Sequence, residues 1–138
     1  MKPLPKTIKA AAVLIFIDLV VLFDHIRLPY MVIMGVYFLE GPLPTTLALC
    51  AFLAMGVGGY LILKKNKRAM RNIQLLAIVF SINALANLVS SFIFGKDIAG
   101  LLERVAGSYS VAGFASVQAV FLATNILLWF TLKNARKV

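Results

Sequence analysis

The sequence predicts an all-α integral membrane protein, a four-helix bundle whose two termini lie on the same side of the bilayer. The composition is 62% hydrophobic and only 14% charged, with a mean hydropathy of +0.95, whereas soluble domains are about 25% charged. Four apolar segments are long enough to cross a hydrocarbon core of about 30 Å, which takes about 20 helical residues. Lysine and arginine also cluster on one side of these segments.

The four expected spans are roughly 8–27, 43–63, 72–94 and 111–132. Each is a continuous apolar run, and a transmembrane barrel would instead need strands of about ten residues with alternating polarity. Helices are therefore expected, because they satisfy their own backbone hydrogen bonds in lipid. The 138 residues contain no long polar linker, so we expect a single transmembrane domain covering 1–138.

The basic residues predict the orientation. Eleven of the fourteen lysines and arginines fall on one side of the four spans: Lys2, Lys6, Lys9, Lys64, Lys65, Lys67, Arg68, Arg71, Lys133, Arg136 and Lys137. Arg27, Lys96 and Arg104 fall on the other side. The positive-inside rule then places both termini in the cytoplasm. The apolar stretch after the basic N-terminus is interpreted as an uncleaved signal anchor, because Ala10, Ala11 and Ala12 precede it instead of following it.

The net charge of +9 is interpreted as topological charge, and no basic run alternates with aromatic residues as single-strand nucleic-acid binding requires. Cys50 and His25 are the only residues of their types. A disulfide, a thiolate cluster and a bis-histidine haem site within one chain are thereby excluded. We expect no cofactor, no metal and no nucleic-acid partner.

Two shorter segments are expected on the outer side. Residues 28–40 are apolar but too short to span comfortably, and they are bracketed by prolines. We interpret them as a re-entrant or interfacial segment, with a kinked continuation of the first helix as the alternative. Residues 97–106 place Ile98, Leu101, Leu102 and Val105 at helical spacing, which predicts an amphipathic helix on the outer interface.

Small residues recur every fourth position on two of the spans. Cys50, Ala54 and Gly58 do so on the second span, and Ala115, Ala119 and Ala123 on the fourth. Small residues let helix backbones approach closely in lipid. We expect them to pack helices within the chain, and the alternatives are a second copy of the chain or a larger membrane complex.

Asp18 is the most informative single residue, because it lies in an apolar run with no lysine or arginine between Lys9 and Arg27. An acid at bilayer depth is costly and indicates a functional site by default. Counting about 1.5 Å of rise per residue places Asp18 and Asn83 near the midplane. The polar column expected from this depth matching comprises Asp18, Asn83, Asn87, Gln118 and Asn125, with His25 near its outer mouth.

Without a basic partner, Asp18 is expected to carry a proton, to face water, or to pair with a bound cation or a cationic partner. A protonated Asp18 that donates to Asn83 or to a backbone carbonyl would only fix helix register. A protonatable carboxyl among amides would equally suit a proton- or cation-coupled carrier, with His25 as a relay. Pairing with another subunit is the third alternative.

Two resemblances are short. The run Arg68-Ala-Met-Arg71-Asn72 resembles the basic-Asn motif of the four-helix MAPEG enzymes, which handle glutathione and lipophilic substrates, although Gln74 stands where those enzymes carry an acid. The start Lys2-Pro3-Leu4-Pro5-Lys6 is similar to that of small bacterial or archaeal four-span proteins. This second resemblance implies the plasma or inner membrane of a prokaryote.

The motifs of common soluble enzymes, GxSxG, HExxH, the P-loop and GxGxxG, are missing from the sequence. Our first expectation is therefore a non-enzymatic accessory or assembly component that works through helix contacts. A small proton- or cation-coupled carrier or channel-like bundle centred on Asp18 is the second. A membrane enzyme for lipophilic substrates is the third.

Overall fold

The computed structural model describes residues 2–27, 30–35, 37–106 and 111–137, without the side chains of residues 30, 31, 38, 101, 102 and 104–106. The chain is mainly helical and contains one small β-hairpin. In order, its elements are α1 (Lys6–Arg27), β1 (Tyr30–Ile33), β2 (Tyr37–Glu40), α2 (Pro42–Leu63), α3 (Lys67–Ile93), α4 (Gly95–Ala106) and α5 (Val111–Ala135).

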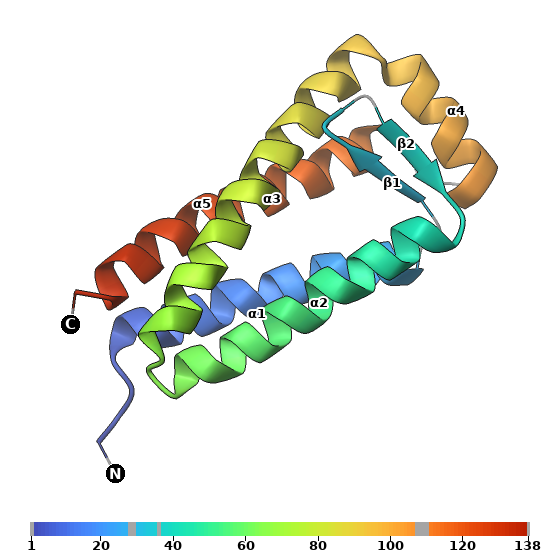
Figure 1. Ribbon diagram of the computed structural model, residues 1–138. Helices are drawn as coiled ribbons and strands as arrows, with labels where there is room; N and C mark the ends of the chain where they lie inside the picture. The colour runs from blue at the N-terminus through green and yellow to red at the C-terminus, as the bar shows by residue number, and fades with distance from the viewer. Residues whose placement is uncertain (1, 28–29, 36, 107–110, 138) are drawn as a thin grey trace.

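The long helices form two pairs, α1 with α2 and α3 with α5, and contacts between α1 and α5 join the pairs. Helices α2 and α3 diverge from the short loop that connects them (Figure 1). Both termini lie at the same end of the molecule as this loop, which we call the loop end. The hairpin and α4 lie at the opposite end, the hairpin end.

Three helices, α2, α3 and α5, are long and apolar enough to cross a membrane. Helix α1 has 22 residues, but any 18 consecutive residues of it include three charged ones, drawn from Lys6, Lys9, Asp18, Asp24 and Arg27. The expected helical fold is thus confirmed, and three helices of the described residues are candidate membrane spans by length and composition. Helix α1 is left out of the candidate spans because of its charged residues and not because of its length.

The helix boundaries follow from local chemistry. Helix α2 begins at Pro42, where a missing N–H costs nothing. Asn66 caps α3 by accepting a hydrogen bond from the backbone N–H of Ala69 at 3.0 Å. Because of this cap, α3 begins at Lys67, five residues before the predicted start at residue 72, so its first turn contains bases that the sequence reading left in a loop.

The structure decides the secondary structure of residues 28–40 where it describes them. Their described part forms an antiparallel hairpin in which Tyr30 pairs with Glu40 and Ile33 pairs with Tyr37. The kinked continuation of the first helix is wrong, since α1 ends at Arg27 and extended backbone follows. Met34 and Gly35, at the tip, both have left-handed backbone (φ 53° and 74°), which reverses the chain tightly.

The amphipathic helix predicted at 97–106 is present as α4, which begins at Gly95. Ile98, from its apolar face, is fully buried. The side chains of Leu101, Leu102 and Val105, the other members of that face, lie outside the described residues.

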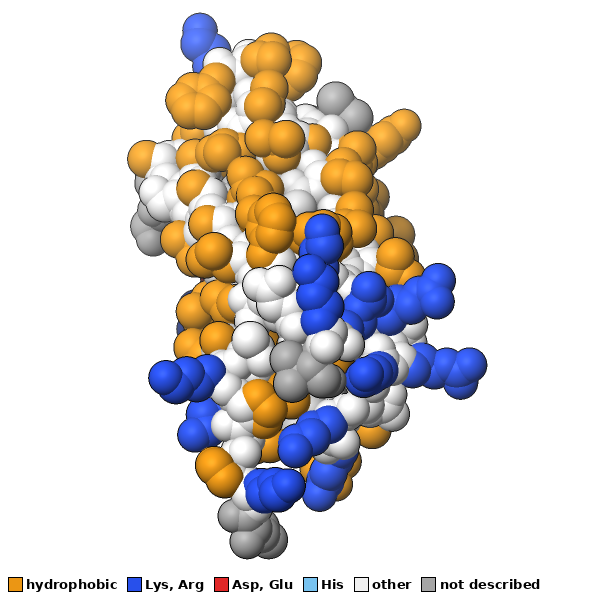
Figure 2. Space-filling model, turned by 90° about the vertical axis from the view of Figure 1, so that its left-hand side faces the viewer, with side chains coloured by type: hydrophobic (Ala, Val, Ile, Leu, Met, Phe, Trp, Pro, Cys, Tyr) orange, Lys and Arg blue, Asp and Glu red, His pale blue; other side chains and the backbone are white. Residues whose placement is uncertain are grey.

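The surface divides by side-chain type. Seen from the loop end, lysine and arginine side chains gather in one region and hydrophobic side chains occupy much of the rest (Figure 2). Large apolar side chains lie on this surface: Phe16 is 66% exposed, Val57 60% and Val79 59%. An exposed apolar band beside a basic end is typical of a protein embedded in lipid.

Two glycines with positive φ allow a test of how closely the hairpin tip docks. Gly35 and Gly41 have φ of 74° and 89°, but a Cβ added at Gly35 would lie 2.6 Å from the Ala86 carbonyl oxygen, whereas at Gly41 nothing lies within 4 Å. Gly41 also has a ψ of −148°, a backbone region nearly restricted to glycine, so Gly41→Ala should cost about 1–3 kcal/mol through its backbone alone. Gly35→Ala should cost about 2–5 kcal/mol, because overpacking against α3 adds to its backbone penalty.

The measurement is the free energy of unfolding in mixed micelles titrated with SDS. A loss for Gly35→Ala of no more than about 2 kcal/mol, the backbone penalty alone, would contradict the close docking of the hairpin on α3.

Candidate functional site

The hairpin tip is fastened to α3 by side-chain amides. The backbone N–H of Met34 donates to Asn83 Oδ1 at 2.7 Å, and that of Gly35 donates to Asn87 Oδ1 at 2.9 Å. Asn87 Nδ2 in turn donates to the carbonyl oxygen of Val32 at 2.8 Å. A hairpin tip leaves backbone groups unpaired, and in apolar surroundings each of them needs a partner.

Two further side chains complete this attachment, which we call the hairpin clamp (Asn83, Asn87, Ser90 and Gln118). Ser90 Oγ donates to the carbonyl oxygen of Gly35. Asn87 Nδ2 also donates to Gln118 Oε1 on α5 at 3.3 Å. Asn87, Ser90 and Gln118 are at most 4% exposed. The clamp therefore connects the hairpin to both members of the α3–α5 pair.

Asp18 and Asn125 form a separate buried pair between α1 and α5. Both are 0% exposed. Asn125 Nδ2 donates to Asp18 Oδ1 at 3.0 Å and to the backbone carbonyl of Phe121 at 2.8 Å. These two bonds use both amide protons, and they leave Asp18 Oδ2 and Asn125 Oδ1 buried with no partner among the described residues.

The two unpartnered atoms of the pair are both oxygens. An ionised carboxylate only accepts hydrogen bonds, and so does an amide oxygen. A proton on Asp18 is therefore the single donor that the pair lacks, and it would remove an uncompensated buried charge at the same time.

An apolar layer separates the pair from the clamp. On α5, Phe121 lies between Gln118 and Asn125, about one helical turn from each. Leu22 lies one turn after Asp18 on α1, and Phe80 lies one turn before Asn83 on α3. The rings of Phe80 and Phe121 are in contact, with centroids 5.3 Å apart. The structure thus divides the residues of the expected polar column into two groups, and it pairs Asp18 with Asn125 instead of with Asn83.

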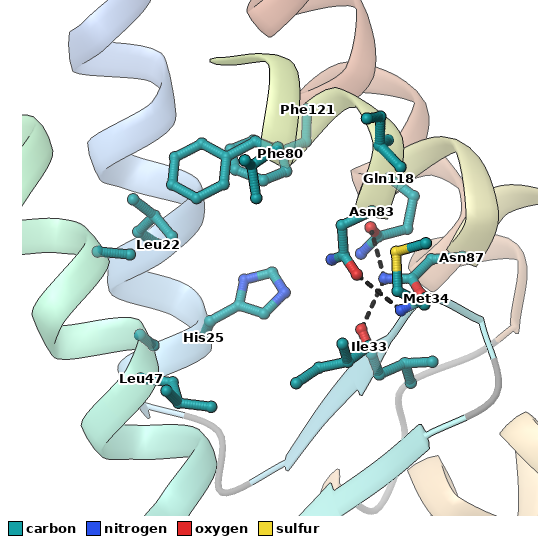
Figure 3. A pocket seen from close by; sticks show the side chains of 15 residues that line it. Leu22, His25, Ile33, Met34, Leu47, Phe80, Asn83, Asn87, Gln118 and Phe121 are labelled. Carbon is teal, nitrogen blue, oxygen red and sulfur yellow. Dashed lines mark hydrogen bonds between the residues drawn. The ribbon is translucent and has the colours of Figure 1, made fainter. Parts of the chain in front are cut away.

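A cavity of about 380 Å³ lies between the two helix pairs beneath the hairpin. Its lining comes from α1, β1, the hairpin tip, α2, α3 and α5 and is mostly apolar, with His25, Asn83, Asn87 and Gln118 as the polar members. Asp18 and Asn125 are not among its lining residues. In Figure 3, His25 extends from α1 into this space, with Asn83 and Gln118 across from it.

The cavity presents one donor and one acceptor that are otherwise unused. His25 Nδ1 lies 2.8 Å from the carbonyl oxygen of Val21, which can only accept, so Nδ1 carries a proton. In the neutral ring, Nε2 is then an acceptor. Asn83 accepts through Oδ1, and its Nδ2 makes no hydrogen bond to the other described residues.

The small-residue stripes are placed mostly away from the core. On α2, Gly58 is buried against Ile73, whereas Cys50 and Ala54 are exposed. On α5, Ala115 is half-buried, and Ala119 and Ala123 are exposed. Of the two stripes, only Gly58 therefore supports a close helix approach within the described chain.

Sequence reasoning missed Ser90 and Gln74. Gln74 is 5% exposed, and its Nε2 donates to the backbone carbonyl of Trp129 at 3.0 Å, which links α3 to α5. The described residues contain no group of three or more His, Cys, Asp or Glu that could hold a metal ion. No protein-family model, curated protein or solved structure matches the chain.

Substitutions at Asp18 test its role in the buried pair. Asp18→Asn supplies a donor from its own amide. Its free energy of unfolding, measured in SDS-titrated mixed micelles, should therefore lie within about 0.5 kcal/mol of the wild-type value. Asp18→Leu strands the amide of Asn125 and should cost about 1–3 kcal/mol. The double variant Asp18→Leu/Asn125→Leu should recover part of that loss, because neither partner is then left unsatisfied.

If Asp18→Asn destabilised the protein as much as Asp18→Leu does, a neutral hydrogen-bonded pair would be the wrong description.

Proposed function

We propose that the protein is a four-span membrane protein whose loop end faces the cytoplasm of a prokaryotic cell. Helix α1 packs along α2 and α5, so it shares their environment although it is more charged. The fully buried position of Asp18 supports this, because its carboxyl is kept away from lipid. The basic residues of the loop end support the orientation.

The topology is tested by labelling single cysteines with a membrane-impermeant maleimide in a Cys50→Ser background. Asp97→Cys should be labelled from outside intact cells, whereas Lys2→Cys and Lys137→Cys should both be labelled only in inverted vesicles. Labelling of Lys2→Cys and Lys137→Cys from opposite sides would instead indicate three crossings.

The function that the geometry supports best is binding of a lipophilic small molecule in the cavity beneath the hairpin. The observation that carries this proposal is a 380 Å³ space with a mostly apolar lining, into which one free donor and one acceptor project. Sites for small molecules commonly have this size and this combination of apolar walls with few polar groups. Helices α2 and α3 diverge on one side of it, which suits a ligand that arrives from the bilayer.

The two cavity atoms without a hydrogen-bond partner among the described residues indicate which polar group the ligand carries. Asn83 Nδ2 donates, and Nε2 of a neutral His25 accepts. A hydroxyl group both accepts and donates, so a hydroxyl on an otherwise apolar molecule suits a donor and an acceptor that face each other across the cavity. The ligand class is therefore a lipophilic alcohol.

This proposal replaces the carrier centred on Asp18, because Asp18 does not line the cavity and is paired with Asn125. The accessory or assembly role remains as a second proposal. It is favoured by one observation, that Ala119 and Ala123 form an exposed small-residue face on α5. Such a face suits a second copy of the chain or another membrane subunit.

The cavity is tested with 1-decanol and its methyl ether, scored by the rise in thermal unfolding temperature in detergent. The wild type should prefer the alcohol, and His25→Leu should reduce that preference roughly 2- to 10-fold in affinity, the value of one hydrogen bond. Ala51→Phe, which fills the cavity from α2, should abolish the stabilisation by both compounds.

The matched control is Ala10→Phe, which adds the same ring on the exposed side of α1, outside the cavity lining. This variant should respond to 1-decanol as the wild type does. Equal responses of Ala51→Phe and Ala10→Phe would rule the cavity out as the binding site.

A further inference from the structure

Six basic side chains converge on one depression at the loop end of the α3–α5 pair. The depression has a volume of about 530 Å³ and is lined by Lys67, Arg68, Arg71, Lys133, Arg136 and Lys137. Three of these residues come from the start of α3, and three from the end of α5 and the residues just after it. Segments more than 60 positions apart in the sequence thus bring only positive charge to one place.

Among the described residues, neither the lining nor the adjoining parts of α3 and α5 supply an acidic side chain. Four of the five acids, Asp24, Glu40, Asp97 and Glu103, belong to the hairpin end, and Asp18 is buried with Asn125. Moreover, Lys67 and Arg68 lie in the first turn of α3, where the helix dipole already disfavours positive charge. Backbone N–H groups and side-chain cations there together favour an anion.

An apolar groove lies farther along the same two helices. It has a volume of about 220 Å³ and is lined by Ile78, Ser81, Ile82, Ile126, Trp129 and Phe130. On α3, Arg71, Ile78 and Ile82 share one face, and on α5 so do Lys133, Phe130 and Ile126. Arg71 and Ile78 are about 10 Å apart along the helix axis.

We propose that the seam between α3 and α5 binds one anionic phospholipid. Its phosphate headgroup occupies the basic depression, and one acyl chain follows the apolar groove toward the middle of the bilayer. Basic pockets between helices at the cytoplasmic side suit such headgroups. The proposal requires α3 and α5 to span the membrane, and it is independent of the ligand in the outer cavity.

The junction of the two regions explains why a lipid fits better than a free anion. Lys133 Nζ lies 5.1 Å from the centre of the Trp129 ring, so a basic residue of the depression directly adjoins an aromatic residue of the groove. A free phosphate would use the depression alone. A phospholipid occupies both, with its headgroup in the depression and its acyl chain in the groove.

Trp129, the only tryptophan, makes the test direct. The full-length protein is reconstituted in phosphatidylcholine bilayers that contain a small fraction of phosphatidylglycerol brominated on its acyl chains. Brominated phosphatidylglycerol bound in the groove should quench the fluorescence of Trp129 at a much lower mole fraction of lipid than brominated phosphatidylcholine does. In the double variant Lys67→Gln/Lys133→Gln, the mole fraction of brominated phosphatidylglycerol needed for the same quenching should rise about 30-fold, the effect expected of two lysines beside an anionic headgroup.

The control is Lys6→Gln/Lys9→Gln, which removes the same charge at the same end of the molecule but from α1. It should be quenched as the wild type is. Equal quenching by the two brominated lipids, or equal loss in both double variants, would overturn the proposal, since general surface charge would then explain the attraction. Reversal of the quenching by millimolar inorganic phosphate would also overturn it, in favour of a small-anion site.

Discussion

The amide of Asn87 is the interaction on which the arrangement of the hairpin end depends. Its oxygen accepts from the Gly35 N–H, and its nitrogen donates both to the Val32 carbonyl and to Gln118 Oε1. A single side chain on α3 thereby holds β1, the hairpin tip and α5. The constraint behind this is that backbone N–H and C=O groups removed from water need hydrogen-bond partners. The hairpin, held by these hydrogen bonds, covers the space between the two helix pairs and so forms one wall of the cavity.

The helical elements were predictable from the sequence because apolar length and basic flanks are local signals. Predicted boundaries for α1, α2 and the start of α5 lie within a few residues of the observed ones. The N-cap at Asn66 was a readable signal that the basic run obscured, since Lys67 to Arg71 looked like a loop. The hairpin was also readable in part, because Gly35 separates two short runs rich in Tyr, Val, Ile and Phe.

The pairing of polar residues was less predictable. Depth counting identified Asp18, Asn83, Asn87, Gln118 and Asn125 as groups that need partners, but depth alone does not tell which helices touch. Because α1 packs on α5 through Asp18 and Asn125, while Asn83 and Asn87 turn to the hairpin, residues of similar depth have different partners. Ser90 was missed for the same reason, since its partner is a backbone carbonyl 55 positions away.

The connectivity of the hairpin has a mechanical consequence. By covalent linkage the hairpin joins α1 to α2, yet its hydrogen bonds run to α3 and, through Asn87, to Gln118 on α5. It therefore acts as a strap that ties one helix pair to the other at the end where α2 and α3 are farthest from their connecting loop. Spreading the two pairs at that end would break the hydrogen bonds of Met34, Gly35 and Val32 to α3 together, so the hairpin resists separation of the pairs there.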